Sequence, residues 1–414
     1  MSILFTPFKL GPITLRNRTI RSAAFENMAY GNSPSDDLIN YHKSVAQGGI
    51  GMTTVAYCAV DLSGVSFDGQ LYVHNEIKDG MRKLTDAIHA EGAKASIQLG
   101  HCGNMTHFYT CKCMPWGPST GFNMYSPTLY RGITKDEIKY LVKKFGEAVD
   151  WSRECGFDCV EIHCGHAYLI SQFLNPTLNR RKDEYGGSLE NRMRFMNEVL
   201  DEVMLHAKDD MAVIVKISMT DGYKGGMTLE EGIEVAKAIN KHGVHGIVLS
   251  AGTVSKTPML ILGGAMPLKA LAHYMNPWKF WWLKLGLIIA GRLLIPTVPY
   301  KKGDLFFLEW AKKFKKEVPD ANFIYVGGVT SRKNCETVLN EGFECFQMGH
   351  VLVNDPAFVN HMKESDENYC SKCLRSNYCI GRMYTLEMKC HHCVENLPEK
   401  LRKEVEEAEN NNAL

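Results

Sequence analysis

The sequence has almost no net charge and no long apolar run. Its 47 Lys and Arg residues nearly balance 46 Asp and Glu residues, which leaves a formal charge of +1 at pH 7. That balance supplies no excess positive field for a polyanion, and no local basic patch of any size compensates, so we expect no nucleic-acid partner. No uninterrupted apolar stretch approaches the roughly 20 residues that a membrane-spanning helix needs.

Targeting signals and dinucleotide motifs are missing as well. The start, MSILFTPFKL, has too short an apolar run and meets charge too early for a secretory signal, so we expect a cytoplasmic protein. No GxGxxG motif follows a candidate strand, so we expect no FAD-binding domain. The composition, 45% hydrophobic and 22% charged, excludes a disordered, collagen-like or coiled-coil chain and is typical of a globular protein with a sizeable core.

Short apolar runs alternate with amphipathic stretches along the chain. Several runs are uninterrupted, as in parallel strands that are covered on both faces. The segment 135–155 places Ile138, Leu141 and Phe145 on one helical stripe. Eight strand–helix repeats predict an α/β fold, a (β/α)8 TIM barrel, with a doubly wound sheet as the alternative. The candidate strands are 19–24, 50–56, 94–99, 157–163, 212–218, 246–250, 323–327 and 345–349, and the candidate helices are 135–155, 191–206, 229–242 and 305–316.

An inserted segment, about 253–300, separates the sixth and seventh candidate strands. Its apolar part, 278–295, is interrupted by Lys279, Lys284 and Arg292. One interpretation is an apolar lid or an interfacial helix that makes peripheral contact with a membrane or a greasy ligand. The other is an inserted helical pair packed on the barrel, or a subunit interface of a homo-oligomer. The charged stretch after residue 398 predicts a solvated helix that frays.

The densest group of reactive side chains follows the fourth candidate strand, in the sequence EIHCGHAYLISQF. In a barrel, His163 ends this strand and His166 and Tyr168 lie in the loop at the active-site mouth. Two imidazoles can polarise one carbonyl oxygen while a phenol delivers a proton. The alternatives are a metal site that includes His101, as in a metal-dependent hydrolase, and histidines that only satisfy hydrogen bonds in the core.

The next stretch, FLNPTLNRRKDEYGGSLENRMRF, resembles the signature of the Old Yellow Enzyme family of flavin-dependent ene-reductases. The segments FTPFKLGPITLRNRTIRSA, SIQLGHCG, GFDCVEIH and FQMGHVLVNDPAF resemble further parts of that family, in the same order. The barrel is similar to that of 2,4-dienoyl-CoA, 2-enoate and bile-acid-type enoate reductases. The resemblance implies an FMN-binding barrel over residues 1–360, with NADH or NADPH as electron donor, followed by a Cys-rich extension and charged tail at 361–414.

The FMN contacts come from the same resemblance. Gln98 is implied to hydrogen-bond the pyrimidine edge of the flavin, and Lys216, where many members carry Arg, to lie near flavin N1 and O2. His350 stands where the family usually has an Arg that grips the phosphate, a departure that weakens FMN binding or makes it depend on pH. The resemblance also assigns Ala23, Ala24 and Ala59 to the flavin ring and Gly327, Gly328 and Gly349 to the phosphate.

The resemblance implies a small-molecule enone as the substrate. Hydride passes from NAD(P)H through flavin N5 to the β-carbon, while His163 and His166 hold the carbonyl oxygen and Tyr168 protonates the α-carbon. The apolar insertion points to a bulky hydrophobic enone, such as a steroid or a lipid. A non-catalytic scaffold that binds flavin or associates with a membrane is the remaining alternative.

Fourteen cysteines are present, and five of them fall near the C-terminus. In a reducing compartment, clustered cysteines indicate metal or redox chemistry. The segment around Cys373 and Cys379 resembles the run that binds a [4Fe–4S] cluster in larger relatives, but Ser376 replaces its second cysteine, and a hydroxyl is a poor ligand for iron. Cys370 could replace the missing ligand, and Cys390 or Cys393 could be the distal one. Free thiols, a zinc site and a cluster served by an external electron donor all remain open.

Overall fold

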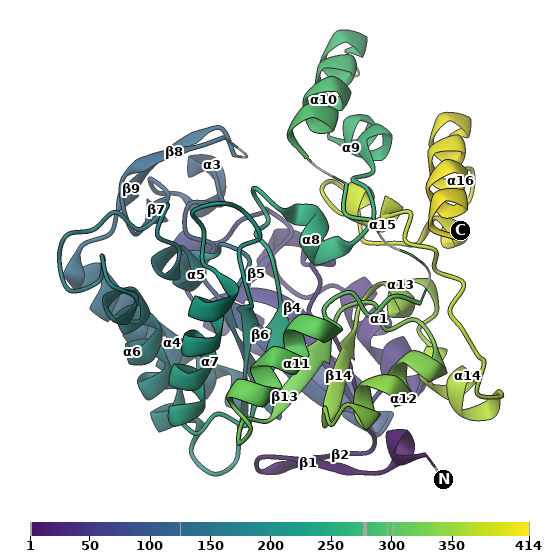
Figure 1. Ribbon diagram of the computed structural model, residues 1–414, viewed down its shortest axis with the longest axis horizontal. Helices are drawn as coiled ribbons and strands as arrows, with labels where there is room; N and C mark the ends of the chain where they lie inside the picture. The colour runs from purple at the N-terminus through teal and green to yellow at the C-terminus, as the bar shows by residue number, and fades with distance from the viewer. Residues whose placement is uncertain are drawn as a thin grey trace.

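A closed barrel of eight parallel strands forms the centre of the protein (Figure 1). The computed structural model describes residues 2–124, 126–275, 280–295, 297–299, 301 and 303–413. The first strand, β3, pairs with β4 and also with the last strand, β14, which closes the ring. This ring confirms the predicted (β/α)8 fold, and the doubly wound alternative is wrong. The barrel strands are β3 (Thr19–Arg21), β4 (Met52–Ala59), β6 (Lys94–Gly100), β10 (Cys159–Cys164), β11 (Ala212–Ser218), β12 (Gly246–Ser250), β13 (Phe323–Val326) and β14 (Cys345–Met348).

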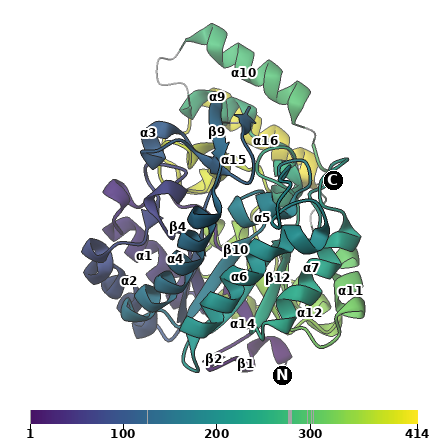
Figure 2. The same ribbon diagram turned by 90° about the vertical axis from the view of Figure 1, so that its left-hand side faces the viewer.

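Helices cover the outside of the barrel and bury their apolar stripes against it (Figure 2). Two of them begin at a capping box, in which a threonine side chain and a glutamate three residues later satisfy the free N–H groups of the first turn: Thr134 with Glu137, and Thr228 with Glu231. The four predicted helices correspond to α4, α6, α7 and α11. The outer helices are α1 (Asp36–Gln47), α2 (Lys78–Ala90), α4 (Lys135–Glu154), α6 (Leu189–Ala207), α7 (Leu229–Lys241), α11 (Leu308–Glu317), α12 (Arg332–Asn340) and α14 (Phe358–Glu364).

A hairpin closes the amino end of the barrel. Its strands, β1 (Phe8–Leu10) and β2 (Ile13–Leu15), lie below the barrel in Figure 1. Leu10 and Leu15 pack with Ile214 and Ile324 from the barrel strands. Because this end is plugged by apolar side chains, a ligand must enter at the other end, where the strands have their carboxyl ends.

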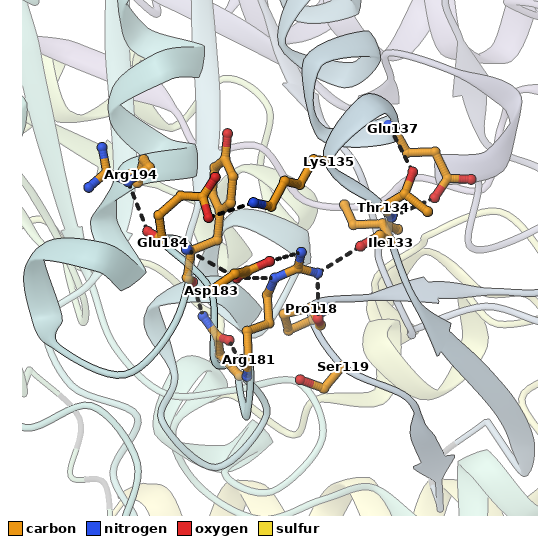
Figure 3. Close-up of polar contacts among 12 residues, drawn as sticks. Pro118, Ser119, Ile133, Thr134, Lys135, Glu137, Arg181, Asp183, Glu184 and Arg194 are labelled. Atoms are coloured by element: carbon orange, nitrogen blue, oxygen red, sulfur yellow. Dashed lines mark hydrogen bonds and ion pairs between the residues drawn. The ribbon is translucent and has the colours of Figure 1, made fainter.

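The loops at that other end are long and are fastened by polar contacts. Arg181 donates to both carboxylate oxygens of Asp183 and to the carbonyls of Pro118 and Ile133 (Figure 3). The family-like signature segment thus ties the loop after β10 to the loop after β6. The short elements of these loops are β5 (Leu71–Tyr72), α3 (Phe108–Cys111), β7 (Trp116–Gly117), β8 (Gly121–Asn123), β9 (Thr128–Gly132) and α5 (Leu169–Leu174).

Three inserted helices lie between β12 and the outer helix α11: α8 (Pro258–Leu262), α9 (Leu268–Tyr274) and α10 (Trp281–Leu294). The predicted apolar stretch 278–295 is described from residue 280 onward, and its first two residues lie outside the described part. Helix α10 stands away from the barrel in Figures 1 and 2. Among the described residues, no helix combines the length and apolarity needed to cross a membrane.

The segment after β14 contains α13 (His350–Asn354), α14, α15 (Tyr378–Arg382) and α16 (Glu399–Ala413). It packs on the inserted helices, because Glu404 accepts hydrogen bonds from the backbone N–H groups of Lys269 and Ala270, and the hydroxyls of Tyr274 and Tyr378 lie 2.5 Å apart. Whether residue 360 divides two domains stays a prediction. The 3₁₀ helices are η1 (Ile3–Phe5), η2 (Tyr30–Asn32), η3 (Leu62–Gly64), η4 (Asn75–Ile77) and η5 (His391–Cys393).

Candidate functional site

A cavity opens at the carboxyl ends of the barrel strands, with about 140 Å³ that the centre of a water molecule can occupy. Its position is that of active sites in such barrels. Eight residues that we predicted to bind FMN or substrate line it: Ala23, Ala24, His166, Lys216, Gly327, Gly328, Gly349 and His350. Four other predicted site residues lie outside its lining: Ala59, Gln98, His163 and Tyr168.

The cavity wall contains buried polar atoms that make no hydrogen bond among the described residues, namely Oε1 of Gln347 and Nε2 of His350. A Cβ placed on Gly349 would meet no atom within 4 Å, so this backbone borders open space. At Gly328, φ is +91° and a Cβ would lie 1.8 Å from the carbonyl oxygen of Asp304, so the position requires glycine. Open space beside glycine backbone and unsatisfied polar atoms fits a polar ligand such as FMN.

Arg375 reaches the cavity from the C-terminal segment and lies near His350. Its side chain is buried, with the guanidinium carbon 4.8 Å from the centre of the Phe306 ring and Nη1 donating to the carbonyl oxygen of Leu262 at 3.4 Å. Burial, together with the charge of Arg375, lowers the pKa of His350 to about 3. His350 is therefore neutral at neutral pH, and Arg375 carries the positive charge at this end of the cavity. No local motif identifies Arg375; the missing arginine at position 350 was its indirect signal.

A buried carboxylate, Glu161 in β10, connects the strands inside the barrel. Its Oε1 lies 2.8 Å from Nζ of Lys216 and accepts a hydrogen bond from Gln98 at 2.6 Å, while Oε2 accepts one from Gln347 at 2.6 Å. Burial lowers the pKa of Lys216, and the neighbouring carboxylate opposes that shift. Nζ of Lys216 also donates to Ser22 Oγ at 3.2 Å. Glu161 begins the reactive group EIHCGHAYLISQF, but we assigned it no role from the sequence, although a charge in the middle of an apolar strand is a signal for such a contact.

His163 lies near the end of β10, and His166 and Tyr168 lie beside it in the loop that follows. The imidazole centres are 5.1 Å apart, and the Tyr168 ring lies 4.7 Å from that of His163 and 5.0 Å from that of Tyr57. Burial lowers the pKa of His163 far below its usual value and that of His166 to about 3, and it raises the pKa of Tyr168. At neutral pH the imidazoles are therefore uncharged, and the phenol keeps its proton.

The backbone at His166 is held in an unusual conformation. His166 and Ala167 have φ of +61° and +62°, and each such residue costs roughly 1–3 kcal/mol when it is not glycine. Two hydrogen bonds stabilise the turn, because the N–H of His166 donates to Ser218 Oγ at 2.8 Å and its carbonyl accepts from Val254 N–H at 3.1 Å. The turn places the ring in the cavity wall, with Nε2 2.7 Å from Ser250 Oγ.

The histidines do not form a metal site with His101. That ring stacks on Trp116 with centres 5.6 Å apart, and its Nε2 lies 3.1 Å from Ser63 Oγ. Across the described ranges, no group of potential ligand atoms within 4.8 Å of one another includes His101, His163 or His166. The geometry therefore gives the metal-hydrolase alternative no support.

The C-terminal cysteines are only partly brought together. Cys373, Cys379 and Cys390 influence one another electrostatically, and burial raises the pKa of all three thiols. The backbone of Cys370 forms an isolated β-bridge with the backbone of Ser331, and Cys393 is exposed. In the described part of the chain, no three of these sulfurs lie within 4.8 Å of one another. Neither a thiolate zinc site nor the four thiolates of an iron–sulfur cluster are assembled, so we derive no reaction step through a cluster.

Comparison with known proteins identifies the family. The model of the NADH:flavin oxidoreductase / NADH oxidase family matches residues 3–257. The 4,4′-dithiodibutanoate disulfide reductase of Rhodococcus erythropolis is 35% identical over 92% of this chain and 93% of its own length. The NADH oxidase of Thermoanaerobacter brockii is 30% identical over 94% of this chain and 55% of its own length.

A solved structure of 2-naphthoyl-CoA reductase with 2-naphthoyl-CoA has the same fold. Its TM-score is 0.79 at 24% identity, over 97% of this chain and 58% of that one. The chain thus spans just over half the length of this reductase and of the NADH oxidase. The family match and the barrel geometry lead to one conclusion: the chain belongs to the NADH:flavin oxidoreductase / NADH oxidase family and is a flavin-dependent oxidoreductase.

Proposed function

We propose that the protein uses FMN and NADH or NADPH to reduce the carbon–carbon double bond of an α,β-unsaturated carbonyl compound. The observation that carries this proposal is the group His163, His166 and Tyr168 beside the cavity. Two neutral imidazoles can hold a carbonyl oxygen as charge develops on it, and a protonated phenol can deliver a proton. Family membership favours this reaction over a metal-dependent hydrolase or a non-catalytic scaffold.

The cavity residues would hold FMN along its length. The cavity-lining backbone of Gly328 and Gly349, the latter beside open space, and the guanidinium of Arg375 suit a phosphate, since arginine pairs with phosphate through several charge-assisted hydrogen bonds. Lys216 would lie at the flavin ring. When bound, FMN supplies the redox chemistry, which is the transfer of hydride from NAD(P)H to the β-carbon of the substrate.

Protein groups would control the substrate and its proton. When the Ser250 hydroxyl donates to Nε2 of His166, the proton of that imidazole lies on Nδ1, where it would be available to the carbonyl oxygen. His163 would provide the second donor. Tyr168 would then transfer its phenolic proton to the α-carbon, and its raised pKa keeps that proton available at neutral pH.

The insertion contributes to the cavity through α8 and not through α10. Ile261 and Leu262 of α8 line the cavity wall, and no described residue of α10 does so. An apolar wall supports the proposal of a bulky hydrophobic enone, such as a steroid or a lipid. If trimming α10 leaves the activity unchanged but Ile261→Asp reduces activity toward large enones more than toward small ones, this assignment is supported. Equal effects on both substrate classes would contradict it.

Helix α10 supports a peripheral contact with an anionic membrane. Seven large apolar side chains at its surface are exposed: Phe280, Trp281, Trp282, Leu285, Leu287, Ile289 and Leu293. The helix contains Lys284 and Arg292 and no acidic residue, which suits anionic lipid headgroups. The protein should sediment with vesicles that contain phosphatidylserine, and Trp281→Asp should abolish this. Loss of a dimer in the variant, without any vesicle binding by the parent, would show that α10 instead contacts a second copy of the chain.

A visible spectrum and an anaerobic titration test the central proposal. The purified protein should be yellow, NADH or NADPH should bleach it, and an enone should restore the colour. A protein that is bleached but reoxidised by 4,4′-dithiodibutanoate and not by enones would place the substrate with that of the Rhodococcus relative. A colourless, chelator-sensitive protein would overturn the proposal.

A further inference from the structure

Three potential metal ligands meet at the C-terminal end of the protein, and none of them lines the flavin cavity. His391 and His392 belong to η5, and Glu409 belongs to α16. Within the described ranges, these are the group of three whose ligand atoms all lie within 4.8 Å of one another. The side chains of His391 and Glu409 are 12% and 18% exposed, and that of His392 is 46% exposed, so the site can be reached from solvent.

The spacing of the ligand atoms matches tetrahedral coordination. Oε1 of Glu409 lies 3.0 Å from Nε2 of His391 and 3.6 Å from Nε2 of His392. Ligands about 2.0–2.1 Å from a tetrahedral zinc ion are separated by about 3.3 Å, between the two observed values. The imidazole centres of His391 and His392 are 4.0 Å apart.

Two further contacts favour a cation over a simple ion pair. Glu409 Oε1 is buried and makes no hydrogen bond among the described residues, although both imidazole nitrogens are near it. The other nitrogen of His391, Nδ1, lies 3.3 Å from Ser376 Oγ. A histidine that binds a metal usually donates its second ring N–H to a neighbouring polar group, which orients the ring. Ser376, which replaces a cysteine of the family-like run, supplies that partner.

We propose that His391, His392 and Glu409 bind a divalent transition cation of the zinc type, with solvent in the fourth position. Imidazole and carboxylate ligands suit this class of ion. The ion would join α16 to η5. Through Ser376, it would also be linked to the segment that carries Arg375. None of the three proposed ligands is a thiol, but Cys390 is a direct neighbour, with its Sγ 4.0 Å from Nδ1 of His391.

Isothermal titration of the flavin-loaded full chain with Zn²⁺ alone tests the proposal. We expect one strong site per chain, and binding at least tenfold weaker in Glu409→Gln and in His392→Asn. Glu399→Gln, at the other end of the same helix and paired there with Lys403, should bind zinc as the parent does. Ser376→Ala should weaken binding by roughly 10- to 100-fold, because it removes an outer partner of a ligand. Unchanged binding in Glu409→Gln would overturn the proposal.

A second measurement separates this site from the cysteines. Co²⁺ bound at the proposed site should show ligand-field bands of nitrogen and oxygen ligation without the intense charge-transfer band of thiolate ligation. The triple variant Cys373→Ser, Cys379→Ser, Cys390→Ser should retain Zn²⁺ binding. Loss of binding in that variant, or a thiolate band with Co²⁺, would overturn the proposal. Melting curves without metal show which variants are folded, and the exposed His392 offers a variant with little effect on the core.

Discussion

Replacing Arg375 should weaken binding of FMN and spare binding of riboflavin, which lacks the phosphate. The structure places this buried guanidinium in the cavity wall near Gly349 and His350. His350 cannot take over its role, because burial lowers the pKa of that imidazole to about 3 and keeps the ring neutral. Arg375→Gln therefore removes the charge that we assign to the phosphate and keeps a side chain of similar length.

The size of the effect follows from the burial of the group. A hydrogen bond to a charged group contributes about 1.5–3 kcal/mol, and solvent does not screen one that is this deeply buried. Since 1.4 kcal/mol is a factor of ten in affinity, Arg375→Gln should raise the FMN dissociation constant roughly 10- to 150-fold. Riboflavin affinity should change by less than about twofold, because riboflavin makes no phosphate contact. Arg375→Lys should fall between, since lysine retains the charge without the fork of donors.

Flavin is first removed from the protein. FMN or riboflavin is then titrated into the flavin-free protein, and the quenching of flavin fluorescence gives the two dissociation constants. Arg332→Gln is a matched control, because Arg332 also lies over an aromatic ring, that of Phe5, and donates to backbone carbonyls without lining the cavity. The double variant Arg375→Gln with His350→Arg should recover much of the FMN affinity by restoring a cation at position 350. Equal losses of FMN and riboflavin affinity would refute the reasoning, because they would show general damage to the cavity.

Three further predictions concern other parts of the site. Tyr168→Phe should slow reoxidation by an enone by roughly 10²- to 10⁴-fold in stopped-flow experiments and leave flavin reduction by NAD(P)H unchanged; equal effects on both half-reactions would contradict its role as proton donor. Lys216→Met should lower the free energy of unfolding in urea by about 3–5 kcal/mol, because it leaves the Glu161 carboxylate buried without its cation. Adding Glu161→Gln should recover much of the lost stability, and no recovery would contradict the pairing of Lys216 with Glu161. Burial raises the pKa of Asp221 to about 6, so its ionisation in the folded state opposes folding. The free energy of unfolding is therefore greatest below the unfolded pKa near 3.9, and about 3 kcal/mol of it is lost as the pH rises through 6. The stability of Asp221→Asn relative to the parent should therefore rise by about 2 kcal/mol between pH 4 and pH 6.5, and a constant difference in thermal melts would show that Asp221 is not perturbed.

The barrel could be predicted because its signals are local. The core of each of the eight strands lies within an apolar run, and the helices between them show a clear apolar stripe. The strand boundaries differ by a few residues, since a run such as 19–24 continues past the last barrel hydrogen bonds of β3, which ends at Arg21. The elements that we did not predict, such as the hairpin β1–β2 and the short strands β7 to β9, have two to five residues each and no periodicity to detect.

The site was less accessible to sequence reasoning because its parts come from distant segments. Positions at strand ends, such as Lys216 and Gly349, follow from the strand pattern and the family resemblance together. Arg375 and Glu161 could not be placed in the same way, since their neighbours belong to other strands and to the C-terminal segment. Ala59 and Gln98 lie at the barrel but outside the cavity lining, so their contact with FMN stays a prediction.

Glu161 has one more consequence, for the way the barrel closes. The groups that contact its carboxylate belong to β6 and β11, the two neighbours of β10, and to β14, the last strand of the barrel. All three strands must be aligned with β10 for these contacts to form. A shift of one residue in any of these strands would turn the contacting side chain to the outer face. A misaligned barrel would then enclose an uncompensated negative charge, which is costly in an apolar interior. The polar centre of the barrel thus discriminates against wrong strand pairings, a task that its surrounding valines and isoleucines, which are nearly interchangeable, cannot perform.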